Sequence, residues 1–306
     1  MKKLFLHLLI LLLSAILYSC DNKEPVPIKE TETDEPINFR LIDSEPAWSP
    51  NGKWIAFHHE EPGKSGIYLI SPDGANIKKL HDGIAATPAW SPNGQWITFS
   101  ENAQIWKMKI NGDSLTQLTF EGRNFYPTWS PDGQWIAFDG WIPDDMKFYG
   151  IFKMKNNGDE KTLFRYDNKE GDMRMPNWVN DSTIIYARYS PLFYSTEIFS
   201  IDSNGKNEIR LTFNNADDRY PRYSNNRITF ISKPNDKPYI SIWEMNADGT
   251  NMKQLTNTQS YACDRSPDGK YIVYTDARAE NGRLWVMDAS GSNKQQLTFE
   301  HHFINF

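Results

Sequence analysis

Apolar residues in this chain come in short runs, and polar turns rich in Pro, Asp, Asn and Gly separate the runs. Runs such as WIAF at 135–138 and IFKM at 151–154 are shorter than a typical helix and show no helical period. Their β-branched and aromatic residues favour strands, and the intervening turns favour tight reversals. The pattern therefore predicts an all-β protein built from short antiparallel strands.

The same pattern recurs along the chain. Each copy opens with a word like PAWSPNGKWIAF at 46–57 and continues with a second apolar run, a polar Gly turn and a short segment ending in Leu. The third residues of the opening words are Trp48, Trp90, Trp129, Trp178, Tyr223 and Arg265. These positions lie about 40–50 residues apart, which is the period of a propeller blade. We therefore predict a six-bladed β-propeller of four-stranded antiparallel blades.

The best-preserved copy of the word is PTWSPDGQWIAF at 127–138. In the tight turn of this copy, the Pro residue presets φ, the Asp132 side chain can hydrogen-bond nearby backbone, and the Gly residue accepts a positive φ. Trp129 and Trp135 flank the turn and can pack between neighbouring blades. Because Asn or Asp occupies the same place in other copies, we interpret Asp132 as a turn residue and not as a catalytic one.

The chain contains one predicted outer strand more than a closed ring of six blades requires. NFRLID at 38–43 and KQQLT at 294–298 both read as the outer strand of a blade, and the chain has one more such strand than six blades need. We expect one of them to complete the last blade and tie the termini together. The tail at 299–306 is expected to lie across the face near the first blade.

The first twenty residues differ from the rest. Two lysines precede an apolar run from Leu4 to Tyr18, which is short for a membrane span and is typical of a signal peptide. The sequence LYSC at 17–20 resembles the lipobox of bacterial lipoproteins, whose Cys carries the lipid. We predict that 1–20 is a lipoprotein signal peptide and that Cys20 is lipidated; the alternative is a secreted protein with a coincidental Cys.

Residues 21–36 contain three prolines and many charges but almost no large apolar side chain, so we predict a flexible tether. Its acidic start resembles the surface-export signals of lipoproteins in the Bacteroidetes. We expect an exported lipoprotein in the outer membrane of a Gram-negative bacterium, facing either the periplasm or the cell surface. The remaining cysteine, Cys263, has no partner once Cys20 carries lipid, and we interpret it as a packed thiol.

The opening words are similar to the WD40-like propeller repeat (PD40) of the TolB family, over residues 40–300. The similarity is strong in repeats one to three and six, whereas repeats four and five carry VND at 179–181 and NN at 225–226 in place of Pro-Asp-Gly. The resemblance implies a six-bladed TolB-like propeller, at 37–306, that binds proteins or ligands in the Gram-negative envelope. TolB carries an α/β domain before its propeller and this chain has only a tether there, so we do not expect a role in the Tol–Pal system.

Composition and motifs narrow the function classes. The net charge is −6 at pH 7 and no block of Lys and Arg occurs, which argues against a nucleic-acid partner. We find no Gly-x-Ser-x-Gly elbow and no Gly-rich phosphate loop. The His pairs at 58–59 and 301–302 lack the spacing of a zinc helix, and the Asp pairs at 144–145 and 217–218 read as solvated charges. No cofactor is expected, although Ca²⁺ held by carboxylates in the central channel stays open.

Function should concentrate in the connections that do not repeat. They lie on one face of the predicted ring, at 58–66, 139–150, 164–175, 187–196, 214–220 and 275–283, and are rich in Arg, Asp and aromatic residues. Ten of the eleven tryptophans occupy repeat positions, and Trp141 alone falls in a long connection. We interpret it either as an exposed anchor or as a Trp packed on its own loop.

Other candidate binding residues flank or enter the innermost strands and can line the central channel. They are Asp139, Arg123, Tyr126, Arg174, Arg219, Tyr220, Arg222, Asp264 and Arg265. For each, the alternative is an ion pair between blades or a hydrogen bond to a loop.

Two functions follow. The first, which we favour, is a non-catalytic, monomeric lipoprotein that binds an envelope protein or glycan through one propeller face and contacts the membrane through its lipid alone. The second is a propeller enzyme such as an oligosaccharide lyase with a channel metal. The lyase requires converging ligands, and the residues that would supply them are His58, His59, Asp139, Asp264, His301 and His302.

Overall fold

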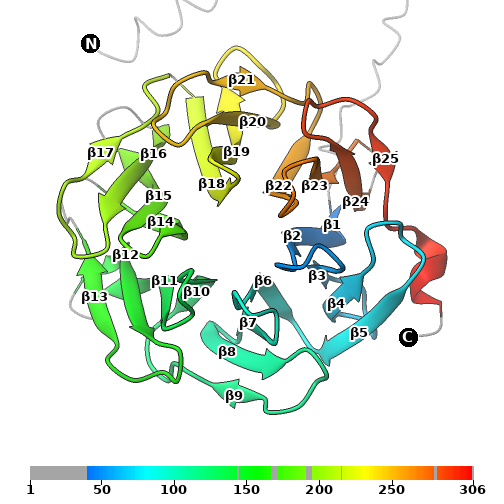
Figure 1. The fold of residues 1–306 in the computed structure, drawn as a ribbon, viewed down its shortest axis with the longest axis horizontal. Coiled ribbons are helices and arrows are strands. Elements are labelled where there is room, and N and C mark those ends of the chain that lie inside the picture. Colours follow the sequence, from blue (N-terminus) through cyan, green and yellow to red (C-terminus); the bar gives the residue numbers. More distant parts are fainter. Residues whose placement is uncertain are drawn as a thin grey trace, which may run out of the picture. The chain divides into compact units, whose positions relative to one another are not determined.

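The computed structural model describes residues 40–142, 145–166, 171–190, 195–214, 216–278 and 281–304. The predictions for the signal peptide, the tether and Cys20 lie outside the described residues. Six blades follow one another around a ring, as Figure 1 shows, and the predicted all-β six-bladed propeller is confirmed. No helix within the described residues is long and apolar enough to span a membrane.

Each of the first three blades is a four-stranded antiparallel sheet whose strands run outward from the axis in chain order. Blade one contains β2 (Asp43–Trp48), β3 (Ile55–His59), β4 (Gly66–Ile70) and β5 (Ile77–Asp82). Blade two contains β6 (Ala85–Trp90), β7 (Trp96–Glu101), β8 (Gln104–Lys109) and β9 (Thr116–Gln117). Blade three contains β10 (Asn124–Trp129), β11 (Trp135–Ile142), β12 (Asp145–Lys155) and β13 (Thr162–Arg165).

Blades four and five have the same order, and blade six has an additional strand. Blade four contains β14 (Met173–Asn180), β15 (Thr183–Ser190), β16 (Ser195–Asp202) and β17 (Ile209–Arg210). Blade five contains β18 (Ala216–Ser224), β19 (Arg227–Pro234), β20 (Ser241–Asn246) and β21 (Lys253–Gln254). Blade six contains β22 (Ser260–Arg265), β23 (Tyr271–Asp276), β24 (Asn281–Asp288), β25 (Gln295–Gln296) and the N-terminal β1 (Arg40–Leu41).

Both terminal strands close the ring, where the sequence led us to expect one. They share the outer edge of β24: β1 pairs in parallel with Asn281 and Gly282, and β25 pairs antiparallel with Trp285 and Val286. The edge of β24 is long enough for both because each terminal strand pairs with only two of its residues. The last blade thereby joins the two ends of the described chain through backbone hydrogen bonds.

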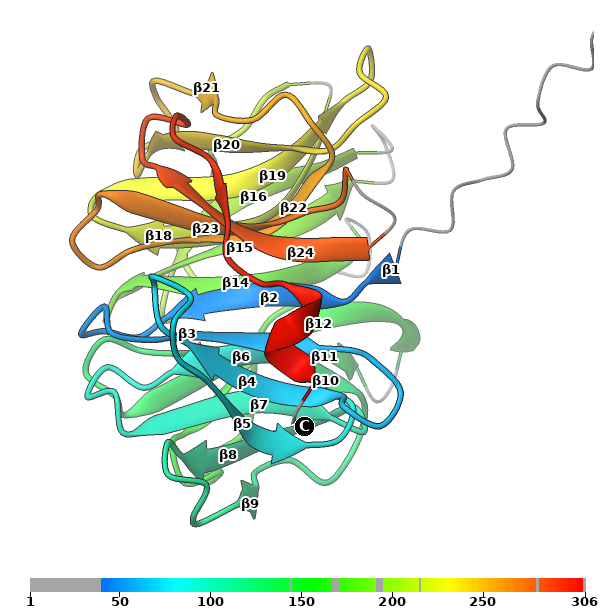
Figure 2. The same ribbon diagram turned by 90° about the vertical axis from the view of Figure 1, so that its right-hand side faces the viewer.

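The tail lies beside blade one as expected, but at the outer edge of the ring and not across a face (Figure 2). It forms the 3₁₀-helix η1 (Glu300–Phe303). The ring of Phe303 is fully buried, stacks on His59 with 3.7 Å between ring centroids, and meets Tyr68 edge-on at 5.4 Å. Its apolar side chain therefore joins blade one to the end of blade six.

The repeated word has the structural role that the sequence predicted. Trp129 is 9% exposed and packs in a cluster formed by blades two and three, where its indole N–H donates to the Thr98 hydroxyl at 3.0 Å. In the turn, the Asp132 carboxylate accepts hydrogen bonds from the Ser130 hydroxyl and from the Gln134 N–H at 2.9 Å. Asn93 accepts the equivalent bonds in blade two. The word therefore supplies interblade packing and turn closure.

Every innermost strand carries a bulge at the residue before the first position of the word. These residues adopt φ between 25° and 58°, and they are Glu45, Thr87, Tyr126, Met175, Tyr220 and Ala262. The pairing with the second strand of the blade shifts register at the same place in each blade. In five blades the next residue is Pro, which has no N–H to donate to a ladder.

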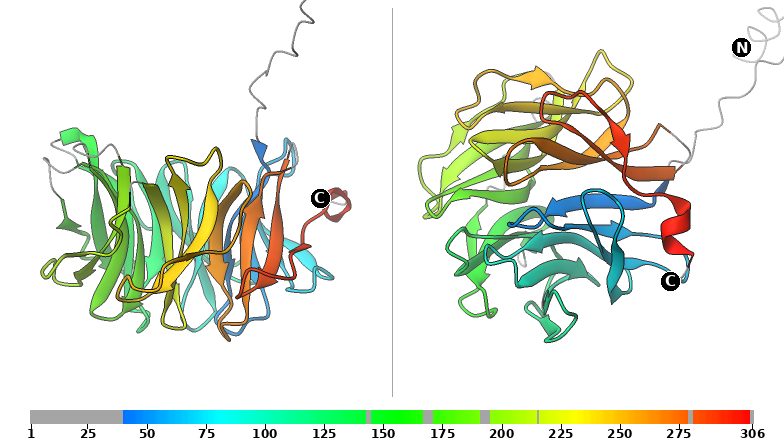
Figure 3. Two further views of the ribbon diagram at one scale, coloured as in Figure 1. Left: turned by 90° about the horizontal axis from the view of Figure 1, so that it is seen from above. Right: turned by 45° about the vertical axis from the view of Figure 1, so that its right-hand side comes forward.

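The ring has two faces, seen edge-on in the left view of Figure 3. The connections from the second to the third strand of each blade, and from each blade to the next, follow one face, which we call the loop face. The turns of the repeated word, such as 130–133, follow the opposite face, which we call the turn face. Arg40, the first described residue, pairs with Asn281 at the loop face.

Candidate partner-binding face

The connections expected at the loop face are shorter than predicted, because the strands continue into them. Trp141 lies on β11 opposite Tyr149 of β12, so its expected position in a loop was wrong. Asp139 also lies on β11, and Ala187 and Thr196 lie on β15 and β16. The second and third strands of each blade stay paired beyond the repeated word, because the residues that follow the word still lie opposite partners on the adjacent strand. Trp141 and Asp139 are therefore held on a strand, whereas Arg123 lies just before β10.

Trp141 and Tyr149 form the outer part of an aromatic cluster. Trp141 is half-buried and meets the Tyr149 ring edge-on, with 5.7 Å between centroids. The guanidinium of Arg123 lies over the Trp141 ring at 4.9 Å and over Phe125 at 5.9 Å. The Arg123 side chain is exposed and forms no ion pair with another described residue. Its charge is therefore held against an aromatic surface and is open to solvent.

Arg174 extends this cluster toward the channel. Its guanidinium lies 4.0 Å from the centre of the Tyr149 ring and 5.9 Å from that of Tyr126. Its Nε is 3.5 Å from a carboxylate oxygen of Asp139, which is fully buried and accepts the Met175 N–H at 2.9 Å. Burial raises the pKa of Asp139 to about 7, although Arg174 opposes the shift. We call Arg123, Trp141, Tyr149, Arg174 and Tyr126 the arginine–aromatic cluster.

Tyr126 and Tyr220 join blades three and five on the inner side of the ring. Their hydroxyl oxygens are 2.7 Å apart, and their rings meet edge-on. Both residues are bulge residues, with φ of 53° and 55°. Burial raises the pKa of both phenols, to about 12 for Tyr220, so both remain neutral and one hydroxyl donates to the other. The bond fixes the inner end of the arginine–aromatic cluster.

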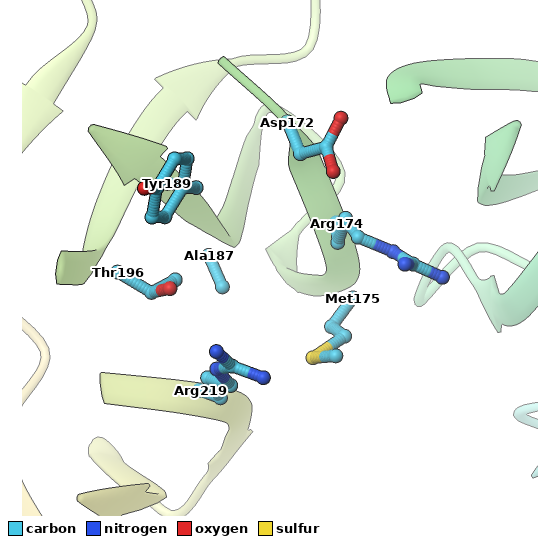
Figure 4. Close-up of a pocket in the computed structure, with 7 residues that line it drawn as sticks. All are labelled: Asp172, Arg174, Met175, Ala187, Tyr189, Thr196 and Arg219. Carbon is cyan, nitrogen blue, oxygen red and sulfur yellow. The ribbon is translucent and has the colours of Figure 1, made fainter. Parts of the chain in front are cut away.

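A pocket of about 300 Å³ adjoins this cluster between blades four and five (Figure 4). It is lined by Asp172, Arg174, Met175, Ala187, Tyr189, Thr196 and Arg219. We call it the blade-four pocket. Arg219 stands on β18 and is 47% exposed, and Asp217 binds its guanidinium through Nε at 2.9 Å and through a terminal nitrogen at 2.8 Å. The cluster and the pocket together contain five of the ten candidates named from the sequence, and two more, Asp139 and Tyr220, contact the cluster.

Three of the other candidates do not join the loop-face cluster. Asp264 accepts the N–H of Trp48 in blade one at 2.7 Å, and burial raises its pKa to about 6 against the effect of Arg222. Arg265 is 6% exposed and pairs with Glu244 of blade five. Arg222 and Asp264 line a smaller pocket of about 210 Å³, together with Pro50 at a turn of the repeated word. The structure thus places Asp264 and Arg265 in contacts between blades.

The family follows from comparison with known proteins. The family model of the TolB beta propeller domain matches residues 20–191 and 122–305, which together span most of the chain. The chain belongs to the TolB beta propeller domain family. No curated protein sequence is significantly similar to this TolB-family propeller.

Solved structures share the fold of this TolB-family propeller. Putative TolB from Agrobacterium tumefaciens has a TM-score of 0.66 and 21% identity, over 76% of this chain and 87% of the other. TolB from Acinetobacter baumannii has a TM-score of 0.68 and 18% identity, over 84% of this chain and 63% of the other. An oligogalacturonate lyase in complex with manganese has a TM-score of 0.59 and 14% identity, over 86% and 80%. At these identities the similarity establishes the fold alone.

In this TolB-family propeller His58 and His59 lie on β3 of blade one, whereas the arginine–aromatic cluster is built on blades three and four. His59 bonds the buried Asp43 with 2.6 Å between Nδ1 and Oδ1, and it stacks on Phe303 between blades six and one. His58 contacts the Ser44 hydroxyl at 3.4 Å. Among the described residues, no three His, Cys, Asp or Glu side chains are grouped so that they could hold a metal ion. Cys263 is buried and its pKa is raised to about 12, mainly by burial, which confirms the predicted packed thiol.

The sequence did not single out six residues of the site, namely Tyr149, Asp172, Met175, Ala187, Tyr189 and Thr196. Asp172 accepts the Tyr149 N–H at 2.9 Å and so ties blade four to blade three. Tyr149 and Tyr189 stand in the connections expected to be functional, but Tyr149 faces Trp141 only once β11 and β12 pair. The alternation of apolar and polar residues beyond the word could have revealed this longer hairpin.

Proposed function

We propose that this TolB-family propeller is a non-catalytic envelope lipoprotein that binds a protein or glycan partner through its loop face. The observation that carries the proposal is the arginine–aromatic cluster, in which Arg123 and Arg174 lie against Trp141 and Tyr149. Arginine and large aromatic side chains dominate binding hot spots because they combine contact area with directed hydrogen bonds. The cluster lies where the sequence does not repeat, so its composition is not explained by blade packing.

The loop face suits an anchored protein. The first described residue, Arg40, lies on this face, and the predicted tether at 21–36 precedes it in the sequence. Lipidation of Cys20 would hold the molecule at the membrane, at about 0.8 kcal/mol per buried methylene group.

Capture of the partner tests the binding role. The propeller at 37–306 is immobilised and exposed to envelope extract from the source cells. Trp141→Ala and Arg219→Gln should reduce the amount of captured partner severalfold while thermal unfolding stays nearly unchanged, because both side chains are partly exposed. Arg278→Gln is the matched control, since Arg278 is 45% exposed, pairs with Asp276 and lies on another blade of the same face. Equal losses in all three variants would contradict a site at the cluster.

A second candidate function is an oligosaccharide lyase, and Asp139 is the observation that favours it. A buried carboxyl group with a pKa near 7 has the proton affinity that a general base requires at neutral pH. The lyase reading predicts that the protein converts acidic oligosaccharides to unsaturated products and that Asp139→Asn abolishes the reaction. If no unsaturated product forms with or without added manganese or calcium, the binding function is retained.

Localisation is tested through the anchor. Cys20→Ala should move the protein from the membrane fraction to the soluble fraction after cell lysis, because the lipid chains are lost. Labelling with a palmitate analogue should disappear in the same variant. A variant that stays in the membrane fraction would contradict lipidation at Cys20.

A further inference from the structure

The blade-four pocket has a chemical character of its own. Blade four supplies Asp172, Arg174, Met175, Ala187, Tyr189 and Thr196, and blade five supplies Arg219. Its volume of about 300 Å³ is at the lower end of the range for small-molecule sites, so it fits one residue of a larger ligand. The inference below rests on the proposed binding function and specifies what this pocket holds.

Arg219 is oriented for an anion. Asp217 holds Nε and one terminal nitrogen, which fixes the plane of the guanidinium. The other terminal nitrogen forms no hydrogen bond with a described residue. Figure 4 shows the guanidinium pointing into the space between Met175, Ala187 and Thr196. A planar guanidinium with unused donors matches the geometry of a carboxylate.

The charged groups around Arg219 are paired with one another. Arg174 also lines the pocket, but its guanidinium points away from Arg219 and lies against the Tyr149 ring and beside Asp139 (Figure 4). The facing Asp139 is ionised only in part at neutral pH, since its pKa is about 7. The carboxylate of Asp172 accepts the Tyr149 N–H, and this hydrogen bond leaves its charge in place. Nearby carboxyl groups therefore match the two guanidinium groups, and an anion would bind through the unused donors of Arg219 and not through an excess of positive charge.

The rest of the lining is mainly apolar. Met175, Ala187 and Tyr189 offer a thioether, a methyl group and an aromatic ring, and among the described lining residues Thr196 alone has an aliphatic hydroxyl. A sugar ring presents several hydroxyl groups, and each would require a polar partner when buried. The carbon skeleton of an apolar amino acid requires none. The lining therefore favours a peptide end over an acidic sugar.

We propose that the blade-four pocket captures the C-terminal residue of a partner protein, with Arg219 binding the terminal carboxylate and Met175, Ala187 and Tyr189 contacting an apolar side chain. The pocket opens beside the arginine–aromatic cluster, so residues that precede the C-terminus would lie along that cluster. Recognition of a terminal carboxylate is an established mode of peptide binding.

Methyl NMR on the mature full-length protein tests this assignment. The protein is labelled with ¹³C-methyl methionine, and Met175→Leu identifies the Met175 signal. The probes are acetylated tripeptides Ala-Ala-X, with X as Leu, Phe or Trp, each prepared with a free C-terminal carboxylate and with a C-terminal amide. We expect at least one free-acid peptide to shift the Met175 signal saturably, and its amide to bind about tenfold more weakly or not at all.

Two variants and one further probe complete the experiment. Arg219→Gln should weaken the free-acid peptide about tenfold, whereas Arg278→Gln should leave its affinity unchanged. Equal binding of acid and amide, no binding of any peptide at millimolar concentration, or binding of glucuronic acid in place of the peptides would overturn the proposal. If the peptides fail but Trp141→Ala still reduces capture from envelope extract, the proposed function stands without this inference.

Discussion

At the scale of the residue, the repeated Asp or Asn of the word closes a turn. Asp132 bonds the Ser130 hydroxyl and the Gln134 N–H, and Asn93 makes the same contacts with Ser91 and Gln95. The acceptor oxygen that both residues share is therefore the functional group, and the negative charge of Asp132 is not required for the turn.

Substitution of Asp132 tests this assignment. Asp132→Ala should lower the free energy of unfolding by about 1 kcal/mol, because two hydrogen bonds at an exposed turn are lost. Asp132→Asn keeps the acceptor and should be close to neutral. Both variants should capture the partner normally. The measurement is denaturant unfolding, and a loss of capture without a loss of stability would assign Asp132 to a binding site.

At the scale of the element, Phe303 stabilises the closure between blade six and blade one. Its fully buried ring contacts His59 and Tyr68. Phe303→Ala should therefore cost about 3 kcal/mol of unfolding free energy. Ile304→Ala is the control, since Ile304 is 70% exposed and its truncation should cost less than about 0.5 kcal/mol. Similar denaturation midpoints for Phe303→Ala and the unmodified protein would show that the tail does not support closure.

The strands and hairpins show how much of the structure can be predicted from the sequence. The repeated word fixed the register of all six blades, because each copy must place a large side chain between blades and a tight turn at one end. The hairpin of β11 and β12 was not predicted beyond the word, since its pairing depends on which residues face each other across the reversal. The shared edge of β24 was also missed, because each terminal strand pairs with only two residues of that edge.

The sequence predicted which types of residue form the site, but it predicted the positions of only some of them. Arg123, Trp141, Arg174 and Arg219 do gather at the loop face. Arg265 looked equivalent in the sequence, but it follows the bulge and points to Glu244 of the neighbouring blade. A single sequence shows which residues depart from the repeat, whereas the side on which each lies depends on the bulge and on the adjacent blade.

At the scale of the whole molecule, buried carboxyl groups make stability depend on pH. Burial raises the pKa of both Asp139 and Glu197 to about 7, whereas the unfolded values are near 4. The folded protein therefore binds more protons than the unfolded chain between these values. The stability that these groups contribute is complete below about pH 4 and is lost as pH rises through 7.

We expect the melting temperature to fall as the pH rises from 6.5 to 8. Below this window the buried His58, whose pKa is lowered by burial, has the opposite effect. Asp139→Asn and Glu197→Gln should each flatten the slope, because the titrating group is removed. The measurement is thermal unfolding at constant ionic strength. A melting temperature that rises through the same window would contradict the protonation of these carboxyl groups in the folded state.

The ring has two faces, and we propose that partners bind the loop face while the turn face belongs to the scaffold. Photo-crosslinking in cells that express the full chain tests it most directly, with a photoreactive phenylalanine analogue placed at one position at a time. Positions 123 and 189 sample the loop face, and the exposed positions 93 and 132 sample the turn face. We predict a discrete crosslinked product from positions 123 and 189 alone, whereas crosslinks from positions 93 and 132 without any from the loop face would contradict the claim.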